Sequence, residues 1–392
     1  MIAENMKELV AGSSIIRAMF EEGKALTEKY GAQNVYDFSL GNPNVAPPDE
    51  IITIINDILV NEQPKLVHGY MNNSGFESTR AVIANSLNEK YNLDLASDNL
   101  AMTVGAAGAL NIILKCILNP ADEVIVFAPF FGEYTHYVSN FGAKLVVIPA
   151  NYPTFEPNIQ MLESAITERT KAVIINTPNN PTGVVYTEQL LTQLTETLRK
   201  KSAQNTIYLI SDEPYREIVY DNVDVPCVLP FYDNTFIAYS YSKSLSLAGE
   251  RIGYVCMNSN MESFEDMIQA LRVANRILGF VNAPSLFQKV IEKCVDVEVD
   301  ISLYKLNRDI LYKHLTDLGF VCVYPQGAFY LFPKAPISDD VLFCMEAKKF
   351  NLLLVPGSAF GCPGYFRVSY CVSNQTVINS LDAFTKLAKI YK

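Results

Sequence analysis

The stretch TFIAYSYSKSLSLAGERIGY, residues 235–254, joins an apolar run to a polar turn that carries a lysine, Lys243. The run is rich in β-branched and aromatic residues, which is typical of a buried strand. Serines surround the lysine, and Arg251 follows in the same turn segment. An exposed turn lysine explains a lone SKS tripeptide in most proteins, so other segments must supply partners before Lys243 is a candidate reactive amine.

Similar apolar runs recur along the middle of the chain. Many have Val and Ile at successive positions, which is typical of strands buried on both faces. Segments with helical spacing, such as ALNIILKCIL and TEQLLTQLTETLRKK, lie between them. With the run that precedes Lys243, the strand candidates are NLAMTVG, DEVIVFA, AKLVVIPA, KAVIIN, TIYLIS, NTFIAYS and RIGYVCM. This alternation predicts an α/β fold: a large domain over residues 46–284 with a mostly parallel seven-stranded sheet flanked by helices.

The pattern changes after about residue 285. A helical stretch, LFQKVIEKCVDVEVDISLYKLNRDILYKHL, is followed by three short strand-like pieces, FVCVYP, GAFYLFP and YFRVSYCV. We therefore expect a smaller α+β domain that combines residues 285–392 with the N-terminal segment, residues 1–45.

Composition narrows the class of protein. The 392 residues carry a formal net charge of −11, which argues against a nucleic-acid partner. No apolar stretch approaches the length of a membrane span, and MIAENMKELVAG lacks the apolar core of a signal peptide. The eight cysteines form no CxxC pair, which favours reduced thiols and a cytoplasmic location. The three histidines are isolated, so no metal site is expected.

Polar groups follow several of the predicted strands. Ala106 and Ala107 lie in a small-residue turn that opens a helix, where free N–H groups can bind an anion. KAVIIN leads to TPNNPTG with Asn180, and TIYLIS ends at Asp212, three residues before Tyr215. Tight packing, a turn and a helix cap explain these features separately.

Ligands bind beyond the carboxyl ends of strands in open α/β sheets, so these groups and Lys243 are expected along one edge. An anion cradle, an amide, a carboxylate, a phenol and an amine together suit a flat, phosphorylated, nitrogen-containing ring attached through an imine.

The segments SYSKSLSLAGERIGY, NNPTG, DEPY and FRVS occur in an order and at separations that resemble the fold-type I, pyridoxal-phosphate-dependent aminotransferases of the aspartate aminotransferase (class I/II) family. The resemblance runs from about residue 14 to the C-terminus. It implies transfer of an amino group from an amino acid to a 2-oxo acid, with pyridoxal 5′-phosphate as cofactor and a homodimer with shared active sites as the active unit.

By that resemblance, Lys243 holds the cofactor through an imine and moves the proton in catalysis, with Asp212 and Tyr215 as its catalytic partners. Asp212 pairs with the ring nitrogen, while Asn180 and Tyr215 bind the phenolic oxygen and Phe131 stacks on the ring. The residues implied for the phosphate are the backbone N–H groups of Ala106 and Ala107, with Ser240, Ser242 and Arg251.

The resemblance also implies substrate contacts. Arg367 matches the arginine that binds the substrate α-carboxylate, and Asn180 and Gly41 lie beside the substrate. Tyr70 matches a tyrosine that reaches the phosphate in the neighbouring subunit. In some aspartate-specific relatives a lysine at the position of Ala107 binds the distal carboxylate.

That lysine is absent here, and Arg276 is about one residue out of register with the arginine that other relatives use. We therefore expect a neutral or aromatic amino acid to serve at least as well as aspartate. Phe130, Phe131, Phe329 and Tyr330 are the candidate apolar contacts.

Two alternatives remain open on the sequence. Carbon–sulfur β-lyases share the lysine, aspartate and arginine of this scaffold. Transcription regulators that carry an aminotransferase-like domain are a second alternative, but they add an N-terminal DNA-binding domain, and the acidic balance of this chain argues against them.

Overall fold

The computed structural model of the chain describes residues 2–11, 23, 26–203 and 205–391. Its centre is a seven-stranded sheet in the order β2-β8-β7-β6-β5-β3-β4. β3 to β7 run parallel, and β8 is antiparallel to both β2 and β7. The strands are β2 (Leu100–Thr103), β3 (Glu123–Phe127), β4 (Lys144–Ile148), β5 (Thr170–Asn176), β6 (Tyr208–Asp212), β7 (Thr235–Ser240) and β8 (Gly253–Met257). Each of the seven predicted runs forms one strand, so the predicted α/β fold with a mostly parallel sheet is confirmed.

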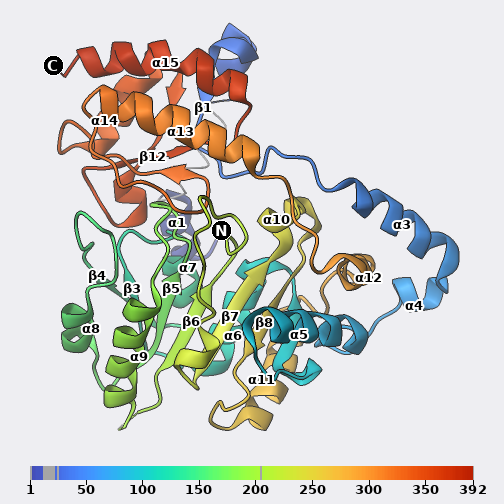
Figure 1. The fold of residues 1–392 in the computed structure, drawn as a ribbon. Coiled ribbons are helices and arrows are strands. Elements are labelled where there is room, and N and C mark those ends of the chain that lie inside the picture. Colours follow the sequence, from blue (N-terminus) through green and yellow to red (C-terminus); the bar gives the residue numbers. More distant parts are fainter. Residues whose placement is uncertain (1, 12–22, 24–25, 204, 392) are drawn as a thin grey trace.

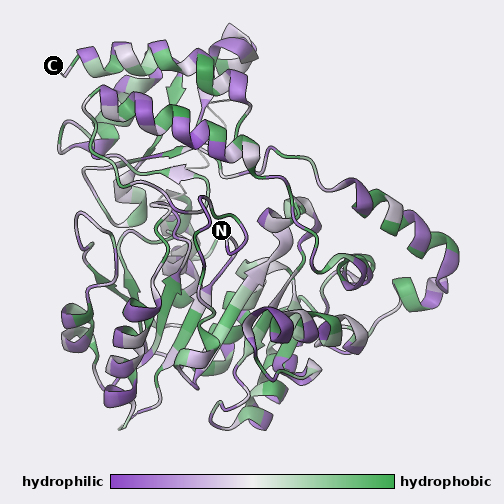
Figure 2. Cartoon of the chain, viewed as in Figure 1, coloured by the Kyte–Doolittle hydropathy of each residue, from purple (hydrophilic) through white to green (hydrophobic). Residues whose placement is uncertain are grey.

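The sheet is buried on both faces, as the Val- and Ile-rich runs predict. In β5, Val173 and Ile175 point into one hydrophobic cluster, whereas Ala172 and Ile174 point into another. Figure 2 shows the central strands mostly green and the surrounding helices with both purple and green faces.

Helices cover the two faces of the sheet (Figure 1). One cluster takes apolar residues from α6 (Gly105–Ile117), α7 (Tyr134–Ser139) and α11 (Phe264–Ile277). The other takes them from α3 (Asp49–Asn61), α4 (Pro64–His68), α5 (Glu77–Tyr91), α8 (Ile159–Ala165), α9 (Glu188–Ser202) and α12 (Ser285–Cys294). α9 shows why these segments are helical: Thr187 caps its first turn by accepting a bond from Leu190 N, and three basic residues in its last turn complement the helix dipole.

A smaller layer lies at one end of the molecule (Figure 1). It contains the parallel pair β1 (Tyr36–Asp37) and β10 (Leu352–Leu353), and a three-stranded sheet of β11 (Val355–Pro356), β12 (Phe366–Ser369) and β9 (Tyr330–Leu331). α13 (Ser302–Asp317), α14 (Asp340–Lys348) and α15 (Asn374–Lys389) pack on a core of their own. Two further short helices are α1 (Glu4–Ala11) and α10 (Tyr241–Ser244).

Two local predictions for this region are wrong. The stretch predicted as one helix is split into α12 and α13, because residues 295–301 contain three acidic residues and Asp300 accepts a bond from Ser302 N, which starts a new helix. FVCVYP forms no strand; Val321 and Tyr324 in it are exposed. α12 packs against α3, α4 and α5. The domain boundaries at residues 45 and 285 stay a prediction.

Among the described residues, no helix combines the length and apolar character that crossing a bilayer requires. The eight cysteines are unpaired.

Candidate active site

A cavity of about 330 Å³ lies beyond the carboxyl ends of β5, β6 and β7, beside the start of α6 and β12. The residues that the resemblance implies for catalysis, cofactor binding and substrate binding all line it, except Tyr70. These lining residues are Gly41, Ala106, Ala107, Phe131, Asn180, Asp212, Tyr215, Ser240, Ser242, Lys243, Arg251 and Arg367. The sheet topology therefore brings together segments that are more than 300 residues apart in the chain.

One end of the cavity is built for an anion. Gly105 begins α6 with a φ of 77°, and a Cβ there would come within 2.7 Å of Arg251 Nη2. The N–H groups of the first turn of α6 have no acceptor within the helix. Ser240 Oγ lies 2.7 Å from Ser242 Oγ, and Arg251 Nη1 lies 3.5 Å from Ser242 Oγ. Free amides, two hydroxyls and a guanidinium suit a phosphate.

Lys243 presents its amine to the middle of the cavity. Its Nζ donates a hydrogen bond to Gly41 O at 2.6 Å and lies 5.4 Å from the centroid of the Phe329 ring. The Lys243 pKa is lowered to about 8, mainly by burial and also by the positive charges of Arg251 and Arg367, against the opposing effect of the Cys371 thiol. About a tenth of the amine is therefore neutral at pH 7, far more than for an ordinary lysine, as a nucleophile or base requires.

Asp212 lies at the end of β6 with one oxygen left to a ligand. Its Oδ2 accepts a hydrogen bond from Tyr134 OH at 2.5 Å, whereas its buried Oδ1 has no partner among the described residues. Burial raises the Asp212 pKa to about 7. An orphaned, buried carboxylate oxygen fits a protonated ring nitrogen, because that partner would neutralise the buried charge. Tyr134 was not predicted; its only sequence signal is its place one helical turn after Phe131.

Arg367, on β12, supplies a buried cation to the cavity. Nη1 donates to Asn180 Oδ1 at 3.1 Å, and Nη2 donates to Ser39 O at 2.6 Å. The guanidinium lies over the rings of Tyr330 and Phe360, at 4.6 and 4.8 Å from their centroids. Within the described part of the chain no carboxylate pairs with it, and its Nε has no partner. This cation is suited to an anionic ligand.

Aromatic residues form the walls between these charged groups. Tyr215 OH lies 2.8 Å from Tyr330 OH, and a Cβ at Gly41 would collide with that second hydroxyl. Glycine at this position therefore lets the backbone approach the cavity closely. Phe131 lines the cavity as predicted, and so does Tyr137, which the sequence did not indicate.

Three predicted contacts, and also Arg276, lie outside the lining of the cavity. Phe130 and Phe329 are buried in the hydrophobic core and do not line the cavity, and their predicted contact with a substrate stays a prediction. Tyr70 is 95% exposed and lies outside the cavity. Arg276 lies in the last turn of α11, is exposed and does not line the cavity either. The expected role of Tyr70 involves another subunit and stays a prediction, as does the expectation that Arg276 does not serve a dicarboxylate.

These groups fit pyridoxal phosphate. The anion cradle suits its phosphate, the unpartnered Asp212 Oδ1 suits its ring nitrogen, and the Lys243 amine lines the same cavity. The described residues contain no group of three or more His, Cys, Asp and Glu side chains that would hold a metal ion.

A family model, described as aminotransferase class I and II, matches residues 33–384. An aspartate aminotransferase from Thermotoga maritima is 31% identical over 367 residues, which are 92% of this chain and 93% of the relative. The aspartate/prephenate aminotransferase of Thermus thermophilus is 28% identical over 370 residues, 93% of this chain and 94% of the relative.

Solved structures agree. An aminotransferase from Eubacterium rectale shares 44% identity and a TM-score of 0.97, with 100% of this chain and 99% of that chain covered. The Thermus thermophilus aspartate aminotransferase with maleate has 25% identity and a TM-score of 0.86, with 95% and 96% covered. The matches favour amino-group transfer with pyridoxal phosphate, and none favours the β-lyase. The chain belongs to the aminotransferase class I and II family and has its fold-type I architecture.

Proposed function

We propose that this cavity carries out transamination with Lys243, Asp212 and Tyr215 as the catalytic residues, and that its preferred donors are neutral or aromatic amino acids. The observation that carries the proposal is that three buried groups face one cavity: an amine with a lowered pKa, an unpartnered carboxylate oxygen and an unpaired guanidinium.

Each residue has a distinct task in this proposal. Pyridoxal phosphate, when bound, supplies a carbon that exchanges the amino group and a ring that withdraws electrons from the substrate. Lys243 Nζ takes the proton from the substrate α-carbon and returns it to the acceptor carbon. Asp212 Oδ1 holds a proton at the ring nitrogen, and Arg367 orients the substrate through its α-carboxylate. Tyr215 and Asn180 orient the ring from the side of its phenolic oxygen.

The substrate preference rests on charge. Arg251, Arg367 and Lys243 are the cations among the described residues that line the cavity, and each already has a proposed partner. A dicarboxylate needs a further cation, because burying its distal charge unpaired is costly. Ala107 supplies none, whereas Tyr137 and Tyr330 offer aromatic surface.

An amino-donor screen tests both the reaction and the preference. With 2-oxoglutarate as acceptor, or pyruvate for the donors other than alanine, we expect kcat/KM for alanine, leucine or phenylalanine to equal or exceed that for aspartate. Oxo-acid product should appear without ammonia; ammonia and pyruvate from a cysteine conjugate would establish the β-lyase instead.

Ala107→Lys is the matched variant for the preference. In this variant the ratio of kcat/KM for aspartate to kcat/KM for phenylalanine should rise about tenfold, which corresponds to about 1.4 kcal/mol. A clear preference of the unchanged protein for aspartate that disappears in Arg276→Ala would contradict the proposal and assign Arg276 to the distal carboxylate.

We further propose a cytoplasmic homodimer in which Tyr70 completes the partner's site. The 95% exposure of Tyr70 on a single chain and the exposed apolar residues Ile52, Val60 and Leu66 on α3 and α4 support the dimer. The eight unpaired cysteines support a reducing compartment.

Hybrid dimers test the shared site. If Tyr70→Ala cripples turnover, mixing it with Lys243→Ala should restore about a quarter of wild-type activity, because half of the randomly formed dimers carry one intact site of two. Mixing Lys243→Ala with the Lys243→Ala/Tyr70→Ala double variant is the control and should restore nothing. A fully active monomer in sedimentation would contradict the proposal.

A further inference from the structure

A buried ion network lies outside the lining of the cavity, among residues that follow β6 and residues of β7 and β8. Its centre is Arg216, whose side chain is 7% exposed. Arg216 Nη1 pairs with Glu213 Oε2 at 3.2 Å, and Nε pairs with Glu217 Oε1 at 2.9 Å. Nη2 donates to Tyr254 OH at 2.9 Å, and the guanidinium lies 4.3 Å from the centroid of the Tyr239 ring. None of these residues lines the catalytic cavity.

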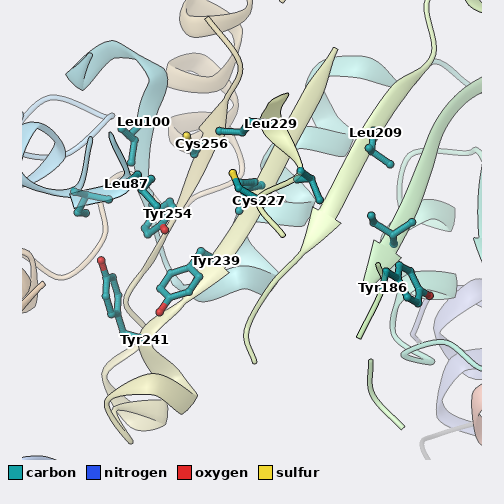
Figure 3. Packing of buried hydrophobic residues seen from close by; sticks show 14 of the residues in the cluster. Leu87, Leu100, Tyr186, Leu209, Cys227, Leu229, Tyr239, Tyr241, Tyr254 and Cys256 are labelled. Carbon is teal, nitrogen blue, oxygen red and sulfur yellow. The ribbon is translucent and has the colours of Figure 1, made fainter. Parts of the chain in front are cut away.

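The network continues to the lysine turn. Tyr239 OH lies 2.8 Å from Glu217 Oε2 and 2.9 Å from Ser244 Oγ. One phenolic hydroxyl donates only one hydrogen bond, so it donates to the carboxylate and accepts from the serine. Figure 3 shows Tyr239, Tyr241 and Tyr254 gathered where β7 and β8 meet α10. Tyr239 and Tyr254 are stacked with centroids 4.8 Å apart.

The two ends of the network have a shared property. Glu213 directly follows Asp212, and Ser244 directly follows Lys243. Glu213 and Ser244, the two ends of the network, therefore each adjoin a residue that lines the cavity, while their own side chains bond within the network. A continuous path of hydrogen bonds and ion pairs joins the backbone of the carboxylate to the backbone of the amine.

We propose that Arg216 and Tyr239 are positioning residues that fix the Lys243 turn relative to Asp212, an inference that rests on the proposed roles of those two residues. The backbone of the turn is held by the Ser240 cap on Ser242 N, by Tyr241 N donating to Ile252 O at 3.1 Å and by Val299 N donating to Ser244 O at 3.2 Å. The bond between Tyr239 and Ser244 is the side-chain link that continues from this turn to the residue after Asp212. A lysine side chain has many rotamers, so its backbone must be held for the amine to reach the reacting atoms. Displacements of about 1 Å in such groups cost up to about 100-fold in rate.

Removing Arg216 itself would leave two carboxylates buried without a cation, and such a protein is expected to fold poorly. Tyr239→Phe and Ser244→Ala are milder, because each removes one hydroxyl of the path and keeps the surrounding packing. Tyr232→Phe is the matched control, because Tyr232 is buried in the same hydrophobic cluster as Tyr239 but lies outside the ion network. Its hydroxyl donates to Ile207 O and lies 2.8 Å from Ser202 Oγ, near the end of β6 that is far from Asp212.

We expect Tyr239→Phe and Ser244→Ala each to lower kcat about tenfold at unchanged KM, as a small misplacement of the amine would. The visible absorption of the cofactor-loaded protein changes with pH as the Lys243 nitrogen bound to the cofactor loses its proton. The midpoint of that change should move to higher pH in both variants, because water that enters beside a looser turn stabilises the protonated Lys243 nitrogen. The double variant should be no worse than the worse single variant, since both changes break the same path. Tyr232→Phe should lower thermal stability comparably and leave kcat and the midpoint unchanged.

Additive losses in the double variant, or a Tyr239→Phe protein that matches Tyr232→Phe in kcat and midpoint, would overturn the positioning role. Borohydride reduction of the loaded wild-type protein, followed by peptide mapping, separates this failure from that of the proposed function. If the cofactor maps to Lys243 and the variants behave like the control, only the network inference fails. A label on another lysine removes the proposed function itself.

Discussion

Replacing Lys243 with alanine is expected to lower turnover at least about 10⁴-fold, because it removes both the attachment amine and the general acid–base group. No other lysine lines the cavity among the described residues, so no neighbouring amine can take over. The phosphate cradle of Arg251, Ser240 and Ser242 stays intact, and the variant should still bind pyridoxal phosphate reversibly. Dialysis should then remove the cofactor from the variant, whereas borohydride should fix it irreversibly to the wild-type protein.

Lys144→Ala is the matched control, since it removes an exposed lysine from β4 at the far edge of the sheet. It should retain wild-type turnover and wild-type labelling by borohydride. A Lys243→Ala protein with appreciable turnover, or with the same irreversible label as wild type, would show that another amine performs the chemistry.

The strands and most of the cavity could be predicted from the sequence for one physical reason. Parallel strands buried on both faces are continuous apolar runs, and the residues after their carboxyl ends meet at one edge. Asn180, Asp212 and Lys243 each follow such a run and each lines the cavity. Arg367 lies on a strand of the smaller layer, and only the family resemblance of FRVS indicated it.

The misses have physical reasons too. Tyr134 and Tyr137 reach the site because the short helix α7 presents one face to it, and a six-residue helix has too little periodicity to reveal that face. The strands of the smaller layer are two to four residues long, so FVCVYP could not be distinguished from them by pattern. Phe130 and Phe329 adjoin the lining residues Phe131 and Tyr330, yet their side chains point into the core.

The ion network around Arg216 shows a further limit of reading the sequence alone. DEPYRE presents charged residues that a pattern assigns to a solvated loop. The fold buries them against Tyr239 and Tyr254 of neighbouring strands, where opposite charges and phenols satisfy one another. Burial of that kind depends on tertiary contacts between β6, β7 and β8, which no local pattern contains.

Asp212→Asn is expected to lower kcat roughly 100- to 1,000-fold, the loss typical of one preorganised electrostatic contact, while it stabilises the cofactor-free protein. Asparagine keeps an oxygen for the Tyr134 hydroxyl, which donates to Asp212 at 2.5 Å, but it cannot hold a proton at the ring nitrogen. Turnover should therefore fall although the cofactor still attaches to Lys243, and a wild-type rate would show that Asp212 only caps its strand end.

The stability gain follows from the buried charge of Asp212. Burial raises its pKa from 3.8 to about 7 in the folded chain, a difference worth roughly 4 kcal/mol. Below pH 4 the carboxyl is protonated in both the folded and the unfolded states, so the substitution changes little. Between about pH 4 and pH 7 the unfolded chain ionises this carboxyl while the folded chain keeps it protonated, so the cost to the folded protein grows with pH. Above pH 7 the cost is complete, and the variant has its full advantage. Thermal unfolding of the cofactor-free proteins at pH 5 and pH 8 measures this.

Asp340→Asn is the control for that measurement: Asp340 is also buried, outside the cavity, but its Oδ2 accepts a hydrogen bond from Ser358 N at 2.6 Å. Its replacement should lower stability and leave kcat unchanged, because the amide oxygen of asparagine accepts the Ser358 bond without the charge that strengthens it. If Asp212→Asn were instead less stable than the wild-type protein at pH 8, the unpartnered Oδ1 would carry no cost to folding. The argument that this oxygen is kept for the ring nitrogen of the cofactor would then lose its physical basis.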